Sequence, residues 1–132
     1  MHRTRLALLA ILAALIVAVL PASATTNDWG TWTFQGHWTS WNGTFVDSHR
    51  VQGFVMGLKS LPRYNVITSF KIGTHVCKTG SSLGTGYCYG VSVPANRKLN
   101  WTVTTRKPLT SSAQLVPCIE WNSKFHCRYG NG

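Results

Sequence analysis

The sequence predicts an all-β fold, a small antiparallel β-sandwich or barrel stabilised by disulfide bonds. Three observations predict it: short segments in which apolar and polar residues alternate, turn-forming Gly and Asn residues between those segments, and four cysteines in a short chain. Alternation with a period of two is typical of strands that bury one face, and beyond residue 24 no segment has the apolar spacing of a helix. Several short strands separated by turns are typical of sandwiches and small barrels.

The N-terminal segment predicts export. Two arginines precede a run of Leu, Ala, Ile and Val at 6–20, and Pro21 ends this run just before the small residues Ala22-Ser23-Ala24. This order is typical of a secretory signal peptide. A membrane-spanning helix needs about 20 apolar residues, so we expect cleavage rather than a stable membrane span. Residues 1–24 are then a signal peptide, and residues 25–132 are a single secreted, extracellular β domain.

Seven or eight short strands are expected in this domain. From the N-terminus, the segments that favour strands are 31–35, 51–58, 64–72, 87–93, 99–105, 115–121 and 124–129. Because side chains alternate between the two faces of a strand, three segments also predict which residues share a face. These sets are Tyr64, Val66, Phe70 and Ile72; Tyr87, Tyr89, Val91 and Val93; and Leu99, Trp101 and Val103. Asn65 is expected on the face opposite to Phe70.

The cysteines indicate two disulfide bonds, because an even number in a short exported chain is typical of a disulfide framework. Four cysteines permit three pairings, and the pairs nearest in sequence, Cys77–Cys88 and Cys118–Cys127, are the ones we expect. Each bond would close a loop of roughly ten residues and stabilise the fold by about 2–3 kcal/mol. Two histidines lie close to cysteines, but the C-x₂-C spacing of structural zinc sites is missing. We therefore expect no metal and no cofactor.

The charge of the chain predicts anionic partners. Without the signal peptide the domain keeps eleven Lys and Arg residues against Asp28, Asp47 and Glu120, a net charge of +8. Such a protein is attracted to an anionic cell surface or polysaccharide, and its charge also permits binding to nucleic acid.

Four tryptophans near the start of the domain are the expected ligand-binding residues. They form two similar motifs, Trp29-Gly-Thr-Trp32 and Trp38-Thr-Ser-Trp41. Residues three apart point to opposite faces of a regular strand, so at most one tryptophan of each motif faces the core. An exposed indole stacks well on sugar rings or lipid headgroups. In the alternative interpretation, Trp32 and Trp38 belong to the core while Trp29 and Trp41 cover the ends of the sandwich.

Two patterns suggest catalysis. Glu120, His126 and Arg128 are candidate residues for a small basic nuclease, because a carboxylate, an imidazole and a guanidinium can together move protons and hold phosphate. In a hairpin of 115–121 and 124–129, Glu120 would lie near Phe125 and His126 one residue further along. The segment Gly80–Gly84 has the letters G-x-S-x-G of a hydrolase nucleophile. That motif requires a strand-to-helix turn, which this chain does not predict.

These observations favour a secreted cationic binding protein that is not an enzyme, directed at a cell envelope or polysaccharide. The Trp-, Thr- and Gly-rich composition is similar to that of exported bacterial carbohydrate-binding modules, a likeness that covers no motif. One alternative is an antimicrobial or toxin-like protein of the bacteriocin type. The second alternative is a small basic secreted ribonuclease.

Overall fold

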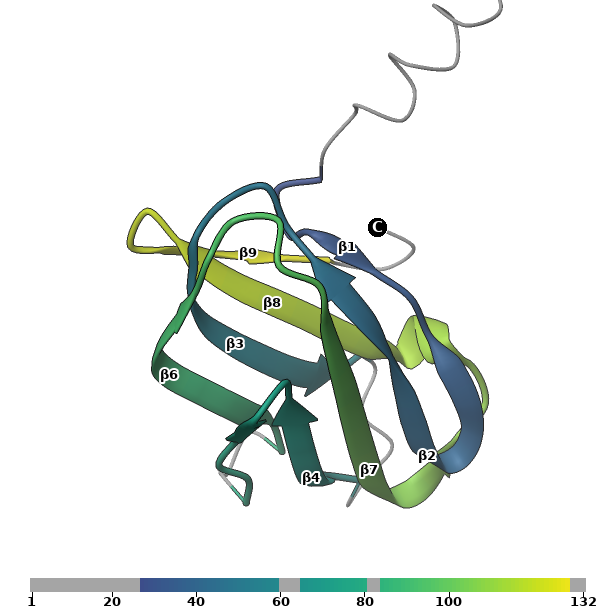
Figure 1. Ribbon diagram of the computed structural model, residues 1–132. Coiled ribbons are helices and arrows are strands. Elements are labelled where there is room, and N and C mark those ends of the chain that lie inside the picture. The colour runs from purple at the N-terminus through teal and green to yellow at the C-terminus, as the bar shows by residue number, and fades with distance from the viewer. Residues whose placement is uncertain (1–26, 60–64, 81–83, 129–132) are drawn as a thin grey trace, which may run out of the picture.

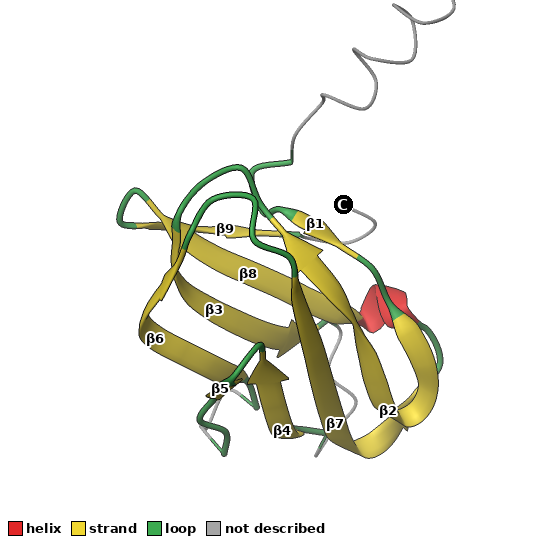
Figure 2. Ribbon diagram, in the orientation of Figure 1, coloured by secondary structure: helices red, strands yellow, loops and turns green. Residues whose placement is uncertain are grey.

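Two antiparallel β-sheets pack face to face in the computed structural model, which describes residues 27–59, 65–80 and 84–128 (Figure 1). The all-β prediction is confirmed, and the predicted signal peptide lies outside the described residues. The strands are β1 (Thr31–Trp32), β2 (Gln35–Val46), β3 (Val51–Leu58), β4 (Ile67–Ile72), β5 (His75–Val76), β6 (Gly86–Val93), β7 (Leu99–Leu109), β8 (Leu115–Trp121) and β9 (Lys124–Cys127). A single short 3₁₀ helix, η1 (Ser112–Gln114), joins β7 to β8 in the described part of the chain (Figure 2).

The first sheet has the strand order β1-β2-β7-β4-β5, and the second has the order β6-β3-β8-β9. In Figure 1 the strands β2 and β7 run across the direction of β3 and β8, which lie behind them. All described strand pairs are antiparallel. The β8–β9 hairpin turns at Asn122 and Ser123, both with positive φ, as a two-residue hairpin turn requires.

The core lies between the two sheets and is rich in aromatic side chains. Its largest fully buried side chains include Trp101, Phe45, Phe54 and Phe70. Trp101 and Val103 on β7 are each 1% exposed, as the alternation in 99–105 predicts. The rings pack edge to face; Phe45 and Phe54, for example, lie 5.2 Å apart across the two sheets. Such pairs stabilise a core beyond the burial of their apolar area.

The faces predicted for Asn65 and Val66 are wrong, and Tyr64 lies outside the described residues. Asn65 is 3% exposed and Ile67 is fully buried, whereas Val66 is half-buried. The pairing of β4 with β7 shifts register between Ile67 and Ser69, and this irregularity reverses the alternation relative to Phe70. The buried Asn65 side chain is satisfied by the main chain of Lys107, whose N–H donates to it and whose carbonyl accepts from it.

Both disulfide pairings are confirmed. Cys77–Cys88 joins the segment after β5 to β6, so it links the edges of the two sheets. Cys118–Cys127 joins opposed residues of the β8–β9 hairpin, with a Cα–Cα distance of 4.1 Å. The structure therefore selects the pairing of nearest neighbours among the three that four cysteines permit.

Replacing Trp41 by Ala is expected to lower the free energy of unfolding by about 3–4 kcal/mol, because the side chain is 7% exposed and its removal leaves a cavity. Trp38→Ala is the matched control, and a change within about 0.5 kcal/mol is expected because its side chain is 70% exposed. Urea unfolding followed by circular dichroism measures both. Equal losses of stability would contradict the assignment of Trp41 to the core and Trp38 to the surface.

Candidate ligand-binding site

The structure separates the four tryptophans into two core residues and two outer ones. Trp32 and Trp41 are buried, 8% and 7% exposed, so their ring faces are not open to a ligand. Trp29 is half-buried and Trp38 is 70% exposed. The alternative interpretation is right that Trp32 belongs to the core. It is wrong for the second motif, in which Trp41 is buried and Trp38 is exposed. The reason is local: Trp38 has φ 61°, and β2 shifts register against β7 between Trp38 and Ser40.

The repeated Trp-x-x-Trp motif has a structural role. In each copy the indole N–H of the second tryptophan donates to the main-chain carbonyl of the first: Trp32 Nε1 to Trp29 O at 2.8 Å, and Trp41 Nε1 to Trp38 O at 3.0 Å. A buried indole needs such an acceptor, because an unpaired N–H in the core is costly. The motif therefore supplies the hydrogen bond that burial of its second tryptophan requires.

The candidate catalytic residues do not lie together. Glu120 is opposite Phe125 in the β8–β9 hairpin, as predicted, whereas His126 is opposite the buried Ile119. Because neighbouring residues of a strand point to opposite faces, Glu120 and His126 lie on different faces of the sheet. The Arg128 guanidinium lies over the rings of Trp29 and Phe34, 5.7 and 5.1 Å from their centroids. The three side chains thus occupy three different environments.

His126 belongs instead to a stack of three rings that the sequence analysis missed. The Trp121 indole lies between His49 and His126, with centroid distances of 3.7 and 3.9 Å and nearly parallel planes. The buried Asp47 carboxylate accepts hydrogen bonds from both the main-chain N–H and Nδ1 of His49, at 2.8 and 2.9 Å. The indole separates the two imidazoles, which line different cavities. His49 lines a cavity of about 510 Å³, and His126 lines one of about 420 Å³.

An exposed aromatic surface lies on the outer face of the four-stranded sheet. Tyr89 of β6 is 60% exposed, and it lies opposite Gly53 of β3. Glu120 of β8 lies on the other side of Gly53 and also opposite Phe125 of β9, which is 45% exposed. Tyr87 adds a third ring, 4.9 Å from that of Tyr89. We call this surface, formed by Tyr87, Tyr89, Phe125, Gly53 and Glu120, the aromatic face.

The rings of the aromatic face lean toward each other across two intervening strands. Strands β6 and β9 are three inter-strand spacings apart, about 14 Å, yet the rings of Tyr89 and Phe125 are 5.9 Å apart. Gly53 lies between Tyr89 and Glu120 in the register and has no side chain; a Cβ there would lie 3.3 Å from the Glu120 Cβ and from the Cys88 carbonyl. The rings therefore meet above Gly53 and Glu120, beside a half-exposed carboxylate.

The alternation in 87–93 predicts Tyr87, Tyr89, Val91 and Val93 on one face, a prediction that hides this surface. Val93 is 4% exposed and Tyr89 is 60% exposed, so that prediction is wrong. Gly90, with φ 69°, lies where β6 shifts register against β3, and the irregularity reverses the alternation. The inner residue of this stretch is Cys88. Its pairing with Cys77 was the one signal in the sequence that Tyr87 and Tyr89 point outward.

Comparison with protein-family models, with curated proteins and with solved structures finds no match for this chain. Within the described ranges, no three His, Cys, Asp or Glu side chains are grouped as metal ligands. In the same ranges, no helix has the length and apolar character to cross a membrane. The aromatic face is therefore assessed from its own geometry.

Asp47→Asn is expected to lower the free energy of unfolding by about 2 kcal/mol, because hydrogen bonds to a buried charged group are strong. Asp28→Asn is the matched control, since Asp28 is exposed and a change within about 0.5 kcal/mol is expected. Chemical unfolding at neutral pH gives both values. If the two variants lose the same stability, the Asp47–His49 contact does not hold the three-ring stack in place.

Proposed function

We propose that this protein is a secreted cationic binding protein that holds a polysaccharide on its aromatic face. The observation that carries the proposal is the contact of Tyr89 with Phe125, two exposed rings that meet above Gly53 and Glu120. Exposed clusters of apolar rings are unfavourable in water and mark surfaces that a ligand covers. Export follows from the predicted signal peptide, and two disulfide bonds are compatible with an oxidising compartment.

The carboxylate of Glu120 favours a sugar over a nucleic acid as the ligand. Aromatic rings stack on sugar rings and on nucleobases alike, so the rings alone do not distinguish the two. A carboxylate accepts hydrogen bonds from sugar hydroxyls. Against a phosphate it would be repulsive, by about 1–4 kcal/mol at 4 Å near a protein surface. Glu120 lies opposite Phe125, where it would meet any ligand stacked on that ring.

The toxin-like alternative is favoured by one separate observation. Trp38 is 70% exposed on β2, beside the ring of His37 at 5.3 Å, and lies opposite Leu109 of β7. An exposed tryptophan on a cationic protein is suited to the headgroup region of an anionic membrane. Leakage of dye from anionic liposomes, lost in Trp38→Ala, would support this second candidate.

Tyr89→Ala and Phe125→Ala are each expected to weaken polysaccharide binding about tenfold, which corresponds to about 1.4 kcal/mol of lost stacking. Co-sedimentation with cellulose, chitin, xylan and bacterial wall preparations identifies a bound polymer and measures its affinity. Trp38→Ala is the control, because this ring is exposed but lies on the other sheet. If Trp38→Ala abolishes binding while Tyr89→Ala leaves it unchanged, the tryptophan site is the correct one and the aromatic face is not.

The substitution Glu120→Gln is expected to change the affinity for a sugar and the affinity for RNA in opposite directions. For a sugar, we expect affinity to fall about three- to tenfold, because a neutral amide is a weaker acceptor of hydroxyl hydrogen bonds than a carboxylate. For single-stranded RNA, removal of the negative charge would raise affinity. Parallel titrations with the bound polysaccharide and with RNA measure both, and a rise in RNA affinity without loss of polysaccharide binding would overturn the proposal.

A further inference from the structure

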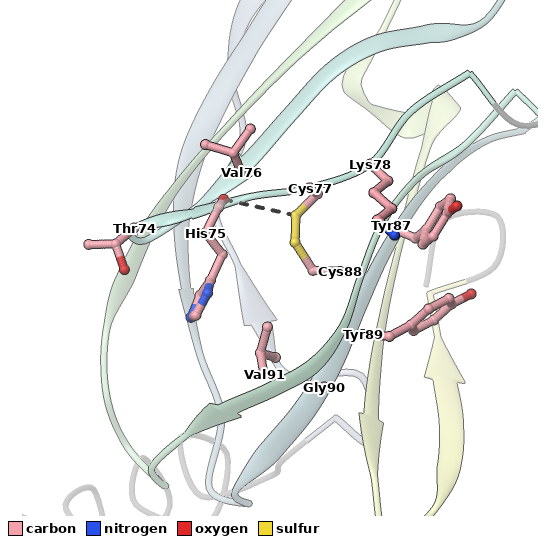
Figure 3. Close-up of a pocket in the computed structure, with 10 residues that line it drawn as sticks. All are labelled: Thr74, His75, Val76, Cys77, Lys78, Tyr87, Cys88, Tyr89, Gly90 and Val91. Carbon is pink, nitrogen blue, oxygen red and sulfur yellow. Dashed lines mark hydrogen bonds between the residues drawn. A yellow bond between two sulfur atoms is a disulfide. The ribbon is translucent and has the colours of Figure 1, made fainter.

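A cavity of about 560 Å³ adjoins the aromatic face at the edge where the two sheets meet (Figure 3). It is lined by residues 74–78, in and after β5, and by residues 87–91 of β6. Tyr87 and Tyr89 belong both to this cavity and to the aromatic face. In Figure 3 the Cys77–Cys88 disulfide lies between His75 on one side and Lys78 with the two tyrosines on the other.

This cavity lies next to the aromatic face, because the chain after β5 pairs with Tyr87. Lys78 and Tyr87 form an isolated β-bridge with two main-chain hydrogen bonds, Lys78 N to Tyr87 O at 2.9 Å and Tyr87 N to Lys78 O at 2.8 Å. Beyond Tyr87, the same cross-strand line passes through Val55 to Cys118. Tyr89 and Phe125 lie on the neighbouring cross-strand line through Gly53 and Glu120, so a polymer that stacks on Tyr89 and passes Tyr87 comes next to Lys78.

The polar groups of the cavity suit an anion. Lys78 supplies an ammonium group and Tyr87 and Tyr89 supply hydroxyl donors on one side of the disulfide, whereas His75 lies on the other side. The ten lining residues include no Asp or Glu. Lys78 is exposed, and in Figure 3 its side chain extends toward Tyr87, so its charge lies beside the aromatic face.

Glu120 restricts where a ligand can carry its charges. It lies on β8, three inter-strand spacings from Lys78, so the main-chain positions of the two residues are about 14 Å apart across the strands. A polymer with a carboxylate on every sugar would place negative charge against Glu120 as well as beside Lys78. A polymer in which acidic sugars alternate with neutral ones satisfies both positions.

We infer that the ligand is an acidic polysaccharide of alternating neutral and uronate sugars. A uronate carboxylate binds in the cavity at Lys78, while neutral sugars stack on Tyr89 or on Phe125, whose planes are inclined at 67°, near Glu120. The inference rests on the proposed function and adds the chemical class of the ligand. Lys78 sets specificity for the charged polymer, and the rings bind the sugar rings of charged and neutral polymers alike.

The test compares hyaluronan, which alternates glucuronate with N-acetylglucosamine, with its fully methyl-esterified form, which has the same backbone without the charge. The mature protein is expected to bind hyaluronan about tenfold more tightly than the ester at 0.1 M NaCl. Lys78→Ala should remove most of this difference, whereas Lys78→Arg should retain it. Lys98→Ala is the matched control, because it removes the same charge from an exposed residue just before β7.

Each outcome separates the inference from the proposed function. Equal losses in Lys78→Ala and Lys98→Ala would show a diffuse charge effect and overturn the inference, while binding of the ester that depends on Tyr89 would still support the proposed function. Failure to bind hyaluronan more tightly than its ester also overturns the inference. The proposed function itself is contradicted if Tyr89→Ala leaves binding to every neutral polymer and every wall preparation unchanged. Thermal unfolding of each variant confirms that it is folded.

Discussion

The indole of Trp101 fixes the five-stranded sheet, because its buried N–H must find an acceptor at the centre of the core. It donates to the carbonyls of both Thr33 and Thr44, at 3.1 and 3.2 Å, and so ties the chain after β1 and the end of β2 to β7. The bond requires a glycine at position 43, where a Cβ would lie 1.7 Å from the Thr33 carbonyl and 2.9 Å from the indole nitrogen. The edges of the Trp32 and Phe34 rings then pack around Trp101.

Three tryptophans serve the core in this way, whereas Trp38 on β2 is 70% exposed. Trp32, Trp41 and Trp101 are buried, and their N–H groups donate to main-chain carbonyls. The faces of these rings therefore pack in the core and are not open to a ligand. Trp121 is likewise enclosed between two imidazoles. On the four-stranded sheet, the exposed rings are those of tyrosine and phenylalanine. A tyrosine hydroxyl remains satisfied by water in the absence of a ligand.

The sequence predicted the fold well and the site poorly, for one physical reason. Alternation and turn residues are local, and they placed strands 51–58 and 115–121 at the bounds observed for β3 and β8. Alternation assigns a face only as far as the next irregularity, and β2, β4 and β6 each contain one. The aromatic face also depends on cross-strand register and on the gap at Gly53, neither of which leaves a local pattern.

The two disulfide bonds give the aromatic face a rigidity that its exposed strands would otherwise lack. Cys118–Cys127 lies on the cross-strand line that runs from β9 through Val55 to Tyr87, and Cys77–Cys88 lies beside the other end of that line. Among the described residues, β9 has a neighbouring strand on one side only, and beyond β3 the strand β6 has just the isolated bridge of Tyr87 with Lys78, so both open more readily than the central strands. A disulfide bond to each of them holds Tyr89 and Phe125 in the positions that stacking requires. Because a preorganised surface loses less conformational entropy on binding, these bonds would add to the affinity of the proposed polysaccharide as well as to stability.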